Sequence, residues 1–129
     1  MIKTKSVKSP IERNDGLRNL VARHLVRYLR RTSYDVWMPN LGPSEILLGE
    51  FRRGKIGWGE FSIRYRQELT ENGSIDRRNT RVKNHGQKFT LRLLQQLGQQ
   101  GDVTLLCHCE EDEPECHRHL LKKKLDGKI

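Results

Sequence analysis

The stretch Val103-Thr-Leu-Leu-Cys-His-Cys-Glu-Glu-Asp-Glu-Pro-Glu-Cys-His-Arg-His119 joins a short apolar run to a dense group of reactive side chains. The run Val103–Leu106 follows Gly101 and Asp102 and is almost entirely apolar. It predicts a strand that is buried on both faces of a parallel sheet. The residues after it hold all three cysteines and three of the five histidines, so a candidate site follows a buried strand.

A helix is predicted to follow this loop. Asp112 is a favourable N-cap, Glu115 stands three residues later, and Pro114 falls in the first turn, where its missing N–H costs little. Lys122–Lys124 suit the negative end of the helix, and Gly127 can close it.

The helical turn decides which reactive side chains can meet. At about 100° per residue, His117 falls near the centre of the apolar face formed by Leu120, Leu121 and Leu125. His119 points away to solvent. The residues that can converge are Cys107, Cys109, Cys116, His117 and Arg118.

The first hypothesis for this cluster is a small-anion pocket for phosphate or a nucleotide, in a protein that could be an enzyme. A strand-to-helix loop offers free N–H groups, and an arginine adds charge-assisted hydrogen bonds. Arg118 and Cys107 are the predicted anion ligands in this segment, and Cys116 and His117 are the candidate catalytic pair. The five acids from Glu110 to Glu115 oppose this reading unless they face solvent.

A zinc site is the second hypothesis, with Cys107, Cys109, Cys116 and His117 as ligands. The spacing Cys-x-Cys-x(6)-Cys-His is not a standard zinc pattern. Adjacent Cys116 and His117 would also point about 100° apart on a helix. The sequence therefore predicts no metal and no cofactor, with zinc as the alternative.

Thiol chemistry is the third hypothesis. A cysteine near a helix start, beside a histidine and an arginine, has the surroundings that lower a thiol pKa, although the nearby carboxylates act in the opposite direction. A reversible disulfide between Cys116 and either Cys107 or Cys109 is a variant of this hypothesis. The contrary interpretation is that the cysteines are small core residues.

Charge along the chain suggests a different kind of partner. Residues 1–100 carry 20 Lys and Arg against 9 Asp and Glu, whereas residues 101–129 carry 5 against 7. A basic protein can bind nucleic acid, and Arg77, Arg78, Arg81 and Lys83 make a basic segment suited to such a module. That segment lacks aromatic residues for stacking on bases, which favours a plain surface loop.

The rest of the chain predicts an α/β fold. Strands are expected over residues 2–7 and 34–38, and helices at about 17–29, 45–51, 61–69 and 89–97, the last capped by Gly98. With the strand at 103–106, this order predicts one domain over residues 1–129. The sheet should be small and mainly parallel with helices on both faces, a Rossmann-like three-layer sandwich.

Ligands of open α/β sheets bind beyond the carboxyl ends of the strands. That rule places Trp37 and Ser44 near the cysteines as further anion-binding candidates, together with Arg13 or Arg18.

Composition excludes other classes. The hydrophobic fraction is 34% and the charged fraction 32%, and no apolar run approaches the roughly 20 residues of a membrane span. The first residues lack the apolar core of a signal peptide, and three cysteines cannot all pair. These features favour a reducing cytoplasm and no membrane partner. The oligomeric state is not predicted.

Four segments, in order along most of the chain, resemble a prokaryotic family of unknown function. They are Asn14-Asp-Gly-Leu-Arg18, Asp35-Val-Trp-Met-Pro-Asn-Leu-Gly-Pro-Ser44, Phe61-Ser-Ile-Arg-Tyr-Arg-Gln-Glu-Leu69, and Leu105-Leu-Cys107 with Pro114-Glu-Cys-His-Arg118. The family is domain-of-unknown-function family four-eight-eight, which includes the YeaO-like proteins. One motif departs: Val21-Ala-Arg-His-Leu-Val-Arg-Tyr28 stands where the family has Val-Asp-Arg-Leu-Trp-Pro-Arg-Gly. The resemblance implies a fold but no established reaction.

Overall fold

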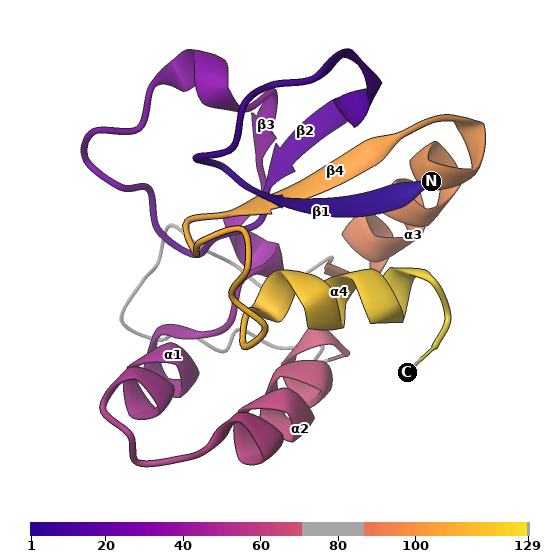
Figure 1. The fold of residues 1–129 in the computed structure, drawn as a ribbon. Coiled ribbons are helices and arrows are strands. Elements are labelled where there is room, and N and C mark those ends of the chain that lie inside the picture. The colour runs from indigo at the N-terminus through magenta and orange to yellow at the C-terminus, as the bar shows by residue number, and fades with distance from the viewer. Residues whose placement is uncertain (71–86, 129) are drawn as a thin grey trace.

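The sheet of the computed structural model, which describes residues 1–70 and 87–128, has four parallel strands in the order β1-β4-β2-β3 (Figure 1). The strands are β1 Ile2–Ser6, β2 Leu17–Leu20, β3 Val36–Trp37 and β4 Val103–Cys107. The last strand of the chain, β4, lies between β1 and β2. Ser6 pairs with Cys107 and Leu20 with Leu106, so three strands end at the same edge of the sheet.

Four α-helices cover one face of this sheet and enclose the main core. They are α1 Glu45–Arg52, α2 Trp58–Leu69, α3 Gln87–Gln100 and α4 His117–Leu125. Figure 1 shows α1, α2 and α4 below the sheet, and α3 contacts both β4 and α4. Phe61, Tyr65 and Leu69 of α2 are buried in this core, as their helical spacing predicts.

Connecting segments cover the other face, where Val7, Leu20, Ala22 and Leu106 form a smaller core. These segments carry short 3-10 helices, Arg13–Asp15 between β1 and β2 and Arg31–Ser33 between β2 and β3. A third, Pro39–Leu41, follows β3. The predicted α/β fold with a small parallel sheet in a three-layer arrangement is confirmed, although connecting segments with short 3-10 helices, and not α-helices, form the layer on this second face. Among the described residues, no helix is long and apolar enough to cross a membrane.

The helix predicted at about 17–29 is wrong. Residues Leu17–Leu20 form β2, which is paired with β4 on one side and β3 on the other. The later apolar residues of the supposed helical face are largely exposed, with Tyr28 at 85%. A short apolar run fits a buried strand as well as a helix face, and here pairing on both sides satisfies the backbone of β2.

The helix after the cysteine loop begins later than its start signals predict. Cys116 is its N-cap, with extended backbone at φ −131° and ψ 135°, and α4 starts at His117 instead of near Asp112. The buried guanidinium of Arg118 binds the carbonyl oxygens of residues 109–111. Those contacts stabilise a loop where capping signals alone favour a helix.

Helix α3 is present where the sequence predicts a helix, but two of its large apolar side chains lie outside the core. Leu91 and Leu94 are buried, whereas Phe89 is 70% and Leu93 51% exposed. The helix continues through Gly98, which therefore is not its cap. A Cβ at Gly98 would stand 2.6 Å from Cδ1 of Ile2, so this glycine permits close approach of α3 to β1.

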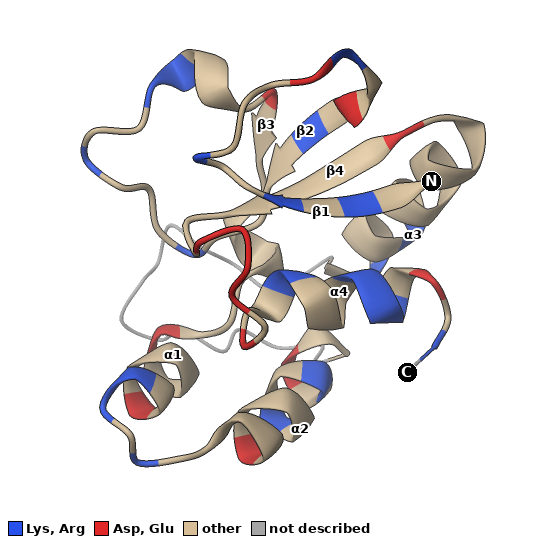
Figure 2. Ribbon diagram, in the orientation of Figure 1, with Lys and Arg blue, Asp and Glu red and all other residues tan. Residues whose placement is uncertain are grey.

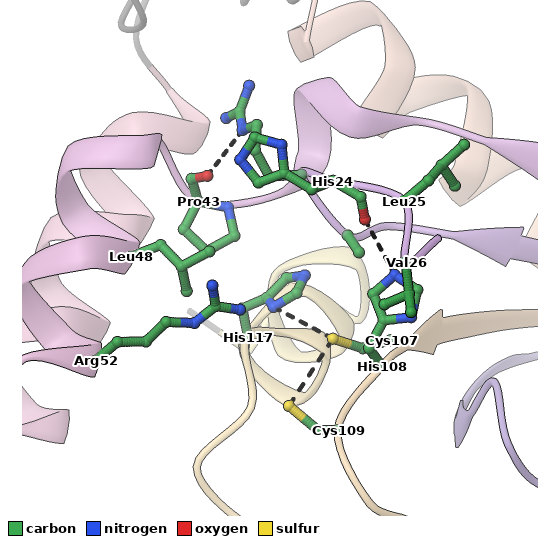
Figure 3. Close-up of a pocket in the computed structure, with 12 residues that line it drawn as sticks. His24, Leu25, Val26, Pro43, Leu48, Arg52, Cys107, His108, Cys109 and His117 are labelled. Carbon is green, nitrogen blue, oxygen red and sulfur yellow. Dashed lines mark hydrogen bonds between the residues drawn. The ribbon is translucent and has the colours of Figure 1, made fainter. Parts of the chain in front are cut away.

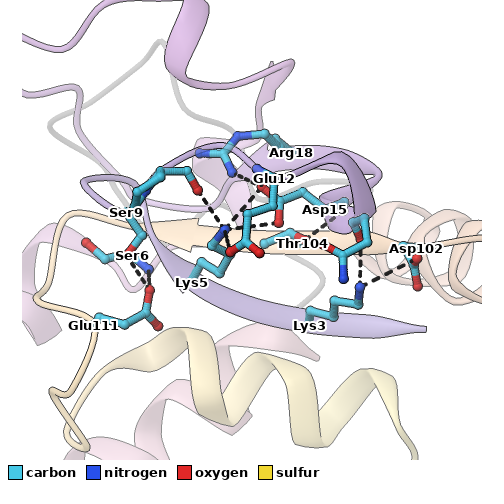
Figure 4. Close-up of polar contacts among 12 residues, drawn as sticks. Lys3, Lys5, Ser6, Ser9, Glu12, Asp15, Arg18, Asp102, Thr104 and Glu111 are labelled. Carbon is cyan, nitrogen blue, oxygen red and sulfur yellow. Dashed lines mark hydrogen bonds and ion pairs between the residues drawn. The ribbon is translucent and has the colours of Figure 1, made fainter.

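A buried polar cluster fastens the connection between β1 and β2 to the sheet (Figure 4). The Asp15 carboxylate accepts hydrogen bonds from Lys5 Nζ, Arg18 Nη1 and the Glu12 backbone N–H. Thr104 Oγ1 of β4 donates to the Asp15 carbonyl oxygen at 2.7 Å. Burial acts to raise the pKa of Asp15, but these donors outweigh it, so the pKa lies below its usual value.

Candidate functional site

A cavity of about 220 Å³ opens where β2 and β4 end (Figure 3). Its walls come from the loop after β2, the end of β4 and the loop that follows it, the first residue of α4, and α1 with Pro43 ahead of it. The described lining residues are Ala22, Arg23, His24, Leu25, Val26, Pro43, Leu48, Arg52, Cys107, His108, Cys109 and His117. The cavity lies at the carboxyl edge of the sheet, where the fold rule places a ligand.

The cavity lining is rich in arginine and histidine side chains. Five of the residues are arginine or histidine, and none of the described lining residues is a carboxylate. Arg23 is buried, and its guanidinium donates to the carbonyl oxygens of Gly42 and Pro43. Arg52 is exposed and extends from the end of α1 into the region shown in Figure 3. These arginines give the cavity a positive field.

Two histidines connect the walls. His108 Nε2 lies 3.0 Å from the carbonyl oxygen of His24, which joins the loop after β4 to the loop after β2. His24 itself is exposed and lies 3.5 Å from the Glu45 carboxylate at the start of α1. His24 therefore lines the cavity, although it falls in the segment that the sequence predicts as a helix over residues 17–29.

Cys107, Cys116 and His117 form a compact buried cluster beside the cavity. Their two Sγ atoms and a His117 ring nitrogen all lie within 4.8 Å of one another. Cys107 Sγ stands 3.9 Å from His117 Nδ1 and 4.0 Å from Cys109 Sγ. All three cysteines are free thiols. The convergence predicted from the sequence is thus present for three cysteines and one histidine.

The backbone determines the tautomer of His117. Its Nε2 lies 2.8 Å from the carbonyl oxygen of Val21, which can only accept a hydrogen bond. In the neutral ring the proton is therefore on Nε2, and the lone pair of Nδ1 faces Cys107. Tyr65 packs edge-on against the ring at 5.7 Å and holds its plane.

Contacts among the three thiols separate their acidities. Hydrogen bonds with Cys109 and Cys116 lower the pKa of Cys107, burial opposes them, and contact with His117 also acts to lower it. The same contact with Cys107 raises the pKa of Cys116 and of Cys109. The cysteine that the surroundings favour as a thiolate is Cys107, whereas the sequence pointed to Cys116 as the nucleophile.

Arg118 is fully buried behind the loop and is not among the cavity-lining residues. Its Nη2 donates to the carbonyl oxygens of Glu110 at 2.9 Å and Glu111 at 3.1 Å. Its Nη1 lies 3.4 Å from the carbonyl oxygen of Cys109. In this structure the guanidinium holds the loop and does not face the cavity.

Trp37 and Ser44, the other predicted anion ligands, also support the walls of the cavity. Trp37 Nε1 donates to the carbonyl oxygen of Ala22 at 2.8 Å. Ser44 caps α1, because its Oγ accepts from the Leu47 N–H and donates to Glu68. Neither residue lines the cavity.

The two arginines that fold logic placed near the cysteines are not in the site. Arg18 is buried in the polar cluster with Asp15, and Arg13 is exposed in the 3-10 helix before β2. Arg77, Arg78, Arg81 and Lys83, the predicted nucleic-acid segment, lie outside the described residues. Nucleic-acid binding stays a prediction.

The acids of the loop between β4 and α4 do not line the cavity, although Figure 2 shows them gathered in one stretch. Glu110 pairs with Lys8 at 2.5 Å. Glu111 accepts hydrogen bonds from Ser9 Oγ and from the backbone N–H of Ser6, on the edge strand β1. Their charges are directed to β1 and solvent, which removes the objection that they raised to an anion pocket.

Arg23, Arg52 and His108 were missed as site residues. Arg23 belongs to the segment predicted as a helix, where its expected position is on the solvent face. Arg52 comes from another part of the chain, and no motif links it to the cysteines. His108 opposes the cysteines in an extended strand, but the chain turns after Cys107 and brings it to the cavity.

A family model described as "Active DUF488-N3 subclade" matches residues 2–128. The match spans nearly the whole chain, including the four segments that carry the motif resemblance. The chain therefore belongs to the DUF488 family, whose function is unknown. No curated protein and no solved structure matches it.

Proposed function

We propose that the cavity binds a small anion, a phosphate or the phosphate group of a small molecule. The observation that carries this proposal is the lining, which combines Arg23, Arg52 and three histidines without a carboxylate among the described residues. Guanidinium groups recognise phosphate oxygens through paired hydrogen bonds.

The burial of Arg23 supports the proposal. Its side chain is almost inaccessible, so its charge is less screened than that of a surface arginine. The Gly42 and Pro43 carbonyls fix its guanidinium, which reduces the entropy cost of binding. Arg52 is exposed and would supply a second guanidinium from the solvent side of the cavity.

The size of the cavity favours a small ligand. At about 220 Å³ it lies below the roughly 300–1,000 Å³ of pockets for drug-sized molecules. Inorganic phosphate or a small phosphorylated molecule is therefore a better match than a dinucleotide. The sulfur and imidazole groups of Cys107 and His117 lie at the same wall, where they would contact the bound molecule.

Arg52→Ala tests the proposal, with Arg53→Ala as the matched control. Both residues are exposed at the end of α1, but only Arg52 lines the cavity. Phosphate and sulfate should raise the melting temperature of the wild type more than chloride at equal ionic strength. Arg52→Ala should lose at least about tenfold in anion affinity, about 1.4 kcal/mol. Arg53→Ala should keep wild-type affinity.

Two outcomes contradict the proposal. One is a wild type that phosphate and sulfate stabilise no more than chloride. The other is an equal loss of affinity in both variants, which would indicate only a general effect of surface charge. Titrations run with a chelator present keep the measurement free of metal effects.

A further inference from the structure

One of the two sequence arguments against a metal, besides the unusual ligand spacing, is that Cys116 and His117 both lie on a helix. In the structure Cys116 precedes the helix as its N-cap, with extended backbone. An extended residue and the first helical residue can direct their side chains to a common point. Cys116 and His117 both approach Cys107, with all three ligand atoms within 4.8 Å of one another. That objection therefore no longer holds.

The distances in the cluster are close to those of a tetrahedral site. Zinc–sulfur bonds of about 2.3 Å and zinc–nitrogen bonds of about 2.0–2.1 Å place two sulfurs about 3.8 Å apart and sulfur and nitrogen about 3.6 Å apart. Cys107 Sγ and His117 Nδ1 are separated by 3.9 Å. A small adjustment of side chains is enough to bring these atoms to a shared ion.

The hydrogen bond of His117 to the backbone also suits a metal ligand. A ligating histidine usually donates its other ring N–H to a carbonyl or carboxylate, which fixes the ring and leaves the ligating nitrogen unprotonated. His117 Nε2 bonds the Val21 carbonyl oxygen, and Nδ1 faces the sulfurs. Thiolate and imidazole donors together favour zinc over the hard cations calcium and magnesium.

We propose that Cys107, Cys116 and His117 bind a zinc ion, with its fourth coordination position open to the cavity. Cys107 and His117 line the cavity, and Cys116 lies behind them, so an ion reaches the cluster from the cavity side. Three protein ligands with one open position is the arrangement of catalytic zinc, which polarises an oxygen of its substrate or activates water. This site does not depend on the anion-binding proposal.

The test measures zinc stoichiometry by chelator competition on reduced, metal-free protein, and the absorption of the cobalt-substituted form. The wild type should bind one zinc per chain, and its cobalt form should show thiolate-to-metal charge transfer. Cys116→Ser and His117→Gln should lose stoichiometric binding. The glutamine amide can still donate to the Val21 carbonyl, so His117→Gln removes the ligand atom while keeping that contact.

Two matched controls lie next to the site. Cys109→Ser removes a half-buried thiol 4.0 Å from Cys107 Sγ, and His119→Ala removes a histidine that bonds the Glu113 carbonyl instead. Both should keep one zinc per chain. Azide added to the cobalt protein should shift its visible bands, because the open position accepts a ligand.

A wild type without stoichiometric zinc overturns the proposal. So does Cys109→Ser losing zinc as completely as Cys116→Ser, or visible bands that azide leaves unchanged. Circular dichroism of the metal-free variants separates loss of a ligand from loss of folding. If Cys116→Ser does not fold, zinc binding by folded His117→Gln decides the question: lost binding supports the site and retained binding overturns it. Anion affinity measured with chelator is unaffected by either result.

Discussion

We expect Arg118→Lys to destabilise the protein, because the Arg118 guanidinium anchors the loop between β4 and α4. The guanidinium makes two good hydrogen bonds, to the Glu110 and Glu111 carbonyls, and a longer one to the Cys109 carbonyl. An ammonium on a flexible stem can replace one of them. Hydrogen bonds to charged groups contribute roughly 1.5–3 kcal/mol each, so losing one good bond and the longer one should cost about 3 kcal/mol.

The loss of an unsatisfied donor makes this cost in unfolding free energy smaller. Arg118 Nε is buried without a hydrogen-bond partner among the described residues, and lysine removes that unsatisfied donor. Regaining about 1 kcal/mol leaves a net loss of about 2 kcal/mol. For a chain of this length, each kcal/mol shifts melting by roughly 3–5 °C, so the melting temperature should fall by about 6–10 °C.

Urea unfolding and thermal melting of Arg118→Lys measure this loss, with Arg66→Lys on the exposed side of α2 as the control. The control should stay within about 0.5 kcal/mol of wild type. An Arg118→Lys variant that melts within about 2 °C of wild type would refute the anchoring role. The sequence interpretation expects that opposite result, stability kept and anion binding lost, because it places the guanidinium in the anion site.

Two further predictions concern the sheet and its cover. Gly16→Ala should cost at least about 2 kcal/mol in urea unfolding, because φ is +64° and a Cβ would stand 1.9 Å from the Asp102 carbonyl oxygen. Gly59→Ala, in the open first turn of α2, should instead stabilise the folded protein by about 0.5–1 kcal/mol. A loss of stability in Gly59→Ala comparable to that in Gly16→Ala would contradict the steric explanation for Gly16. Because the pKa of Asp15 is lower in the folded protein than its unfolded value of 3.8, the ionised carboxylate stabilises the fold. This stabilisation is complete at a pH above the unfolded pKa and is lost as the pH falls through the lower folded pKa. Asp15→Asn should therefore flatten the fall of the urea midpoint between about pH 5 and pH 3, and an unchanged slope would count against the assignment.

Local signals predicted much of the fold and part of the site. The buried strand β4 and the helices α1 and α2 each depend on residues close in sequence, where period and capping apply directly. The meeting of Cys107 with His117 followed from a strand leading into a helix.

Long-range contacts account for what the sequence did not predict. Pairing on both sides made a strand of Leu17–Leu20, and the carbonyl contacts of Arg118 moved the helix start to His117. Arg52 reaches the cavity from a helix about 55 residues before the cysteines, and no spacing rule connects such a pair. The arginines of the site therefore required the structure.

The position of β4 has a consequence for how the chain folds. Neither β1 nor β2 pairs with the other, and each pairs with a strand about 85 to 100 residues later. Until residues 103–107 leave the ribosome, the only described strand pairing open to the N-terminal part is the two-residue contact between β2 and β3. Native pairing of such high sequence separation is slow, because loop closure must precede it. The sheet should thus form late in synthesis, and the edges of β1 and β2 stay exposed to chaperones until then.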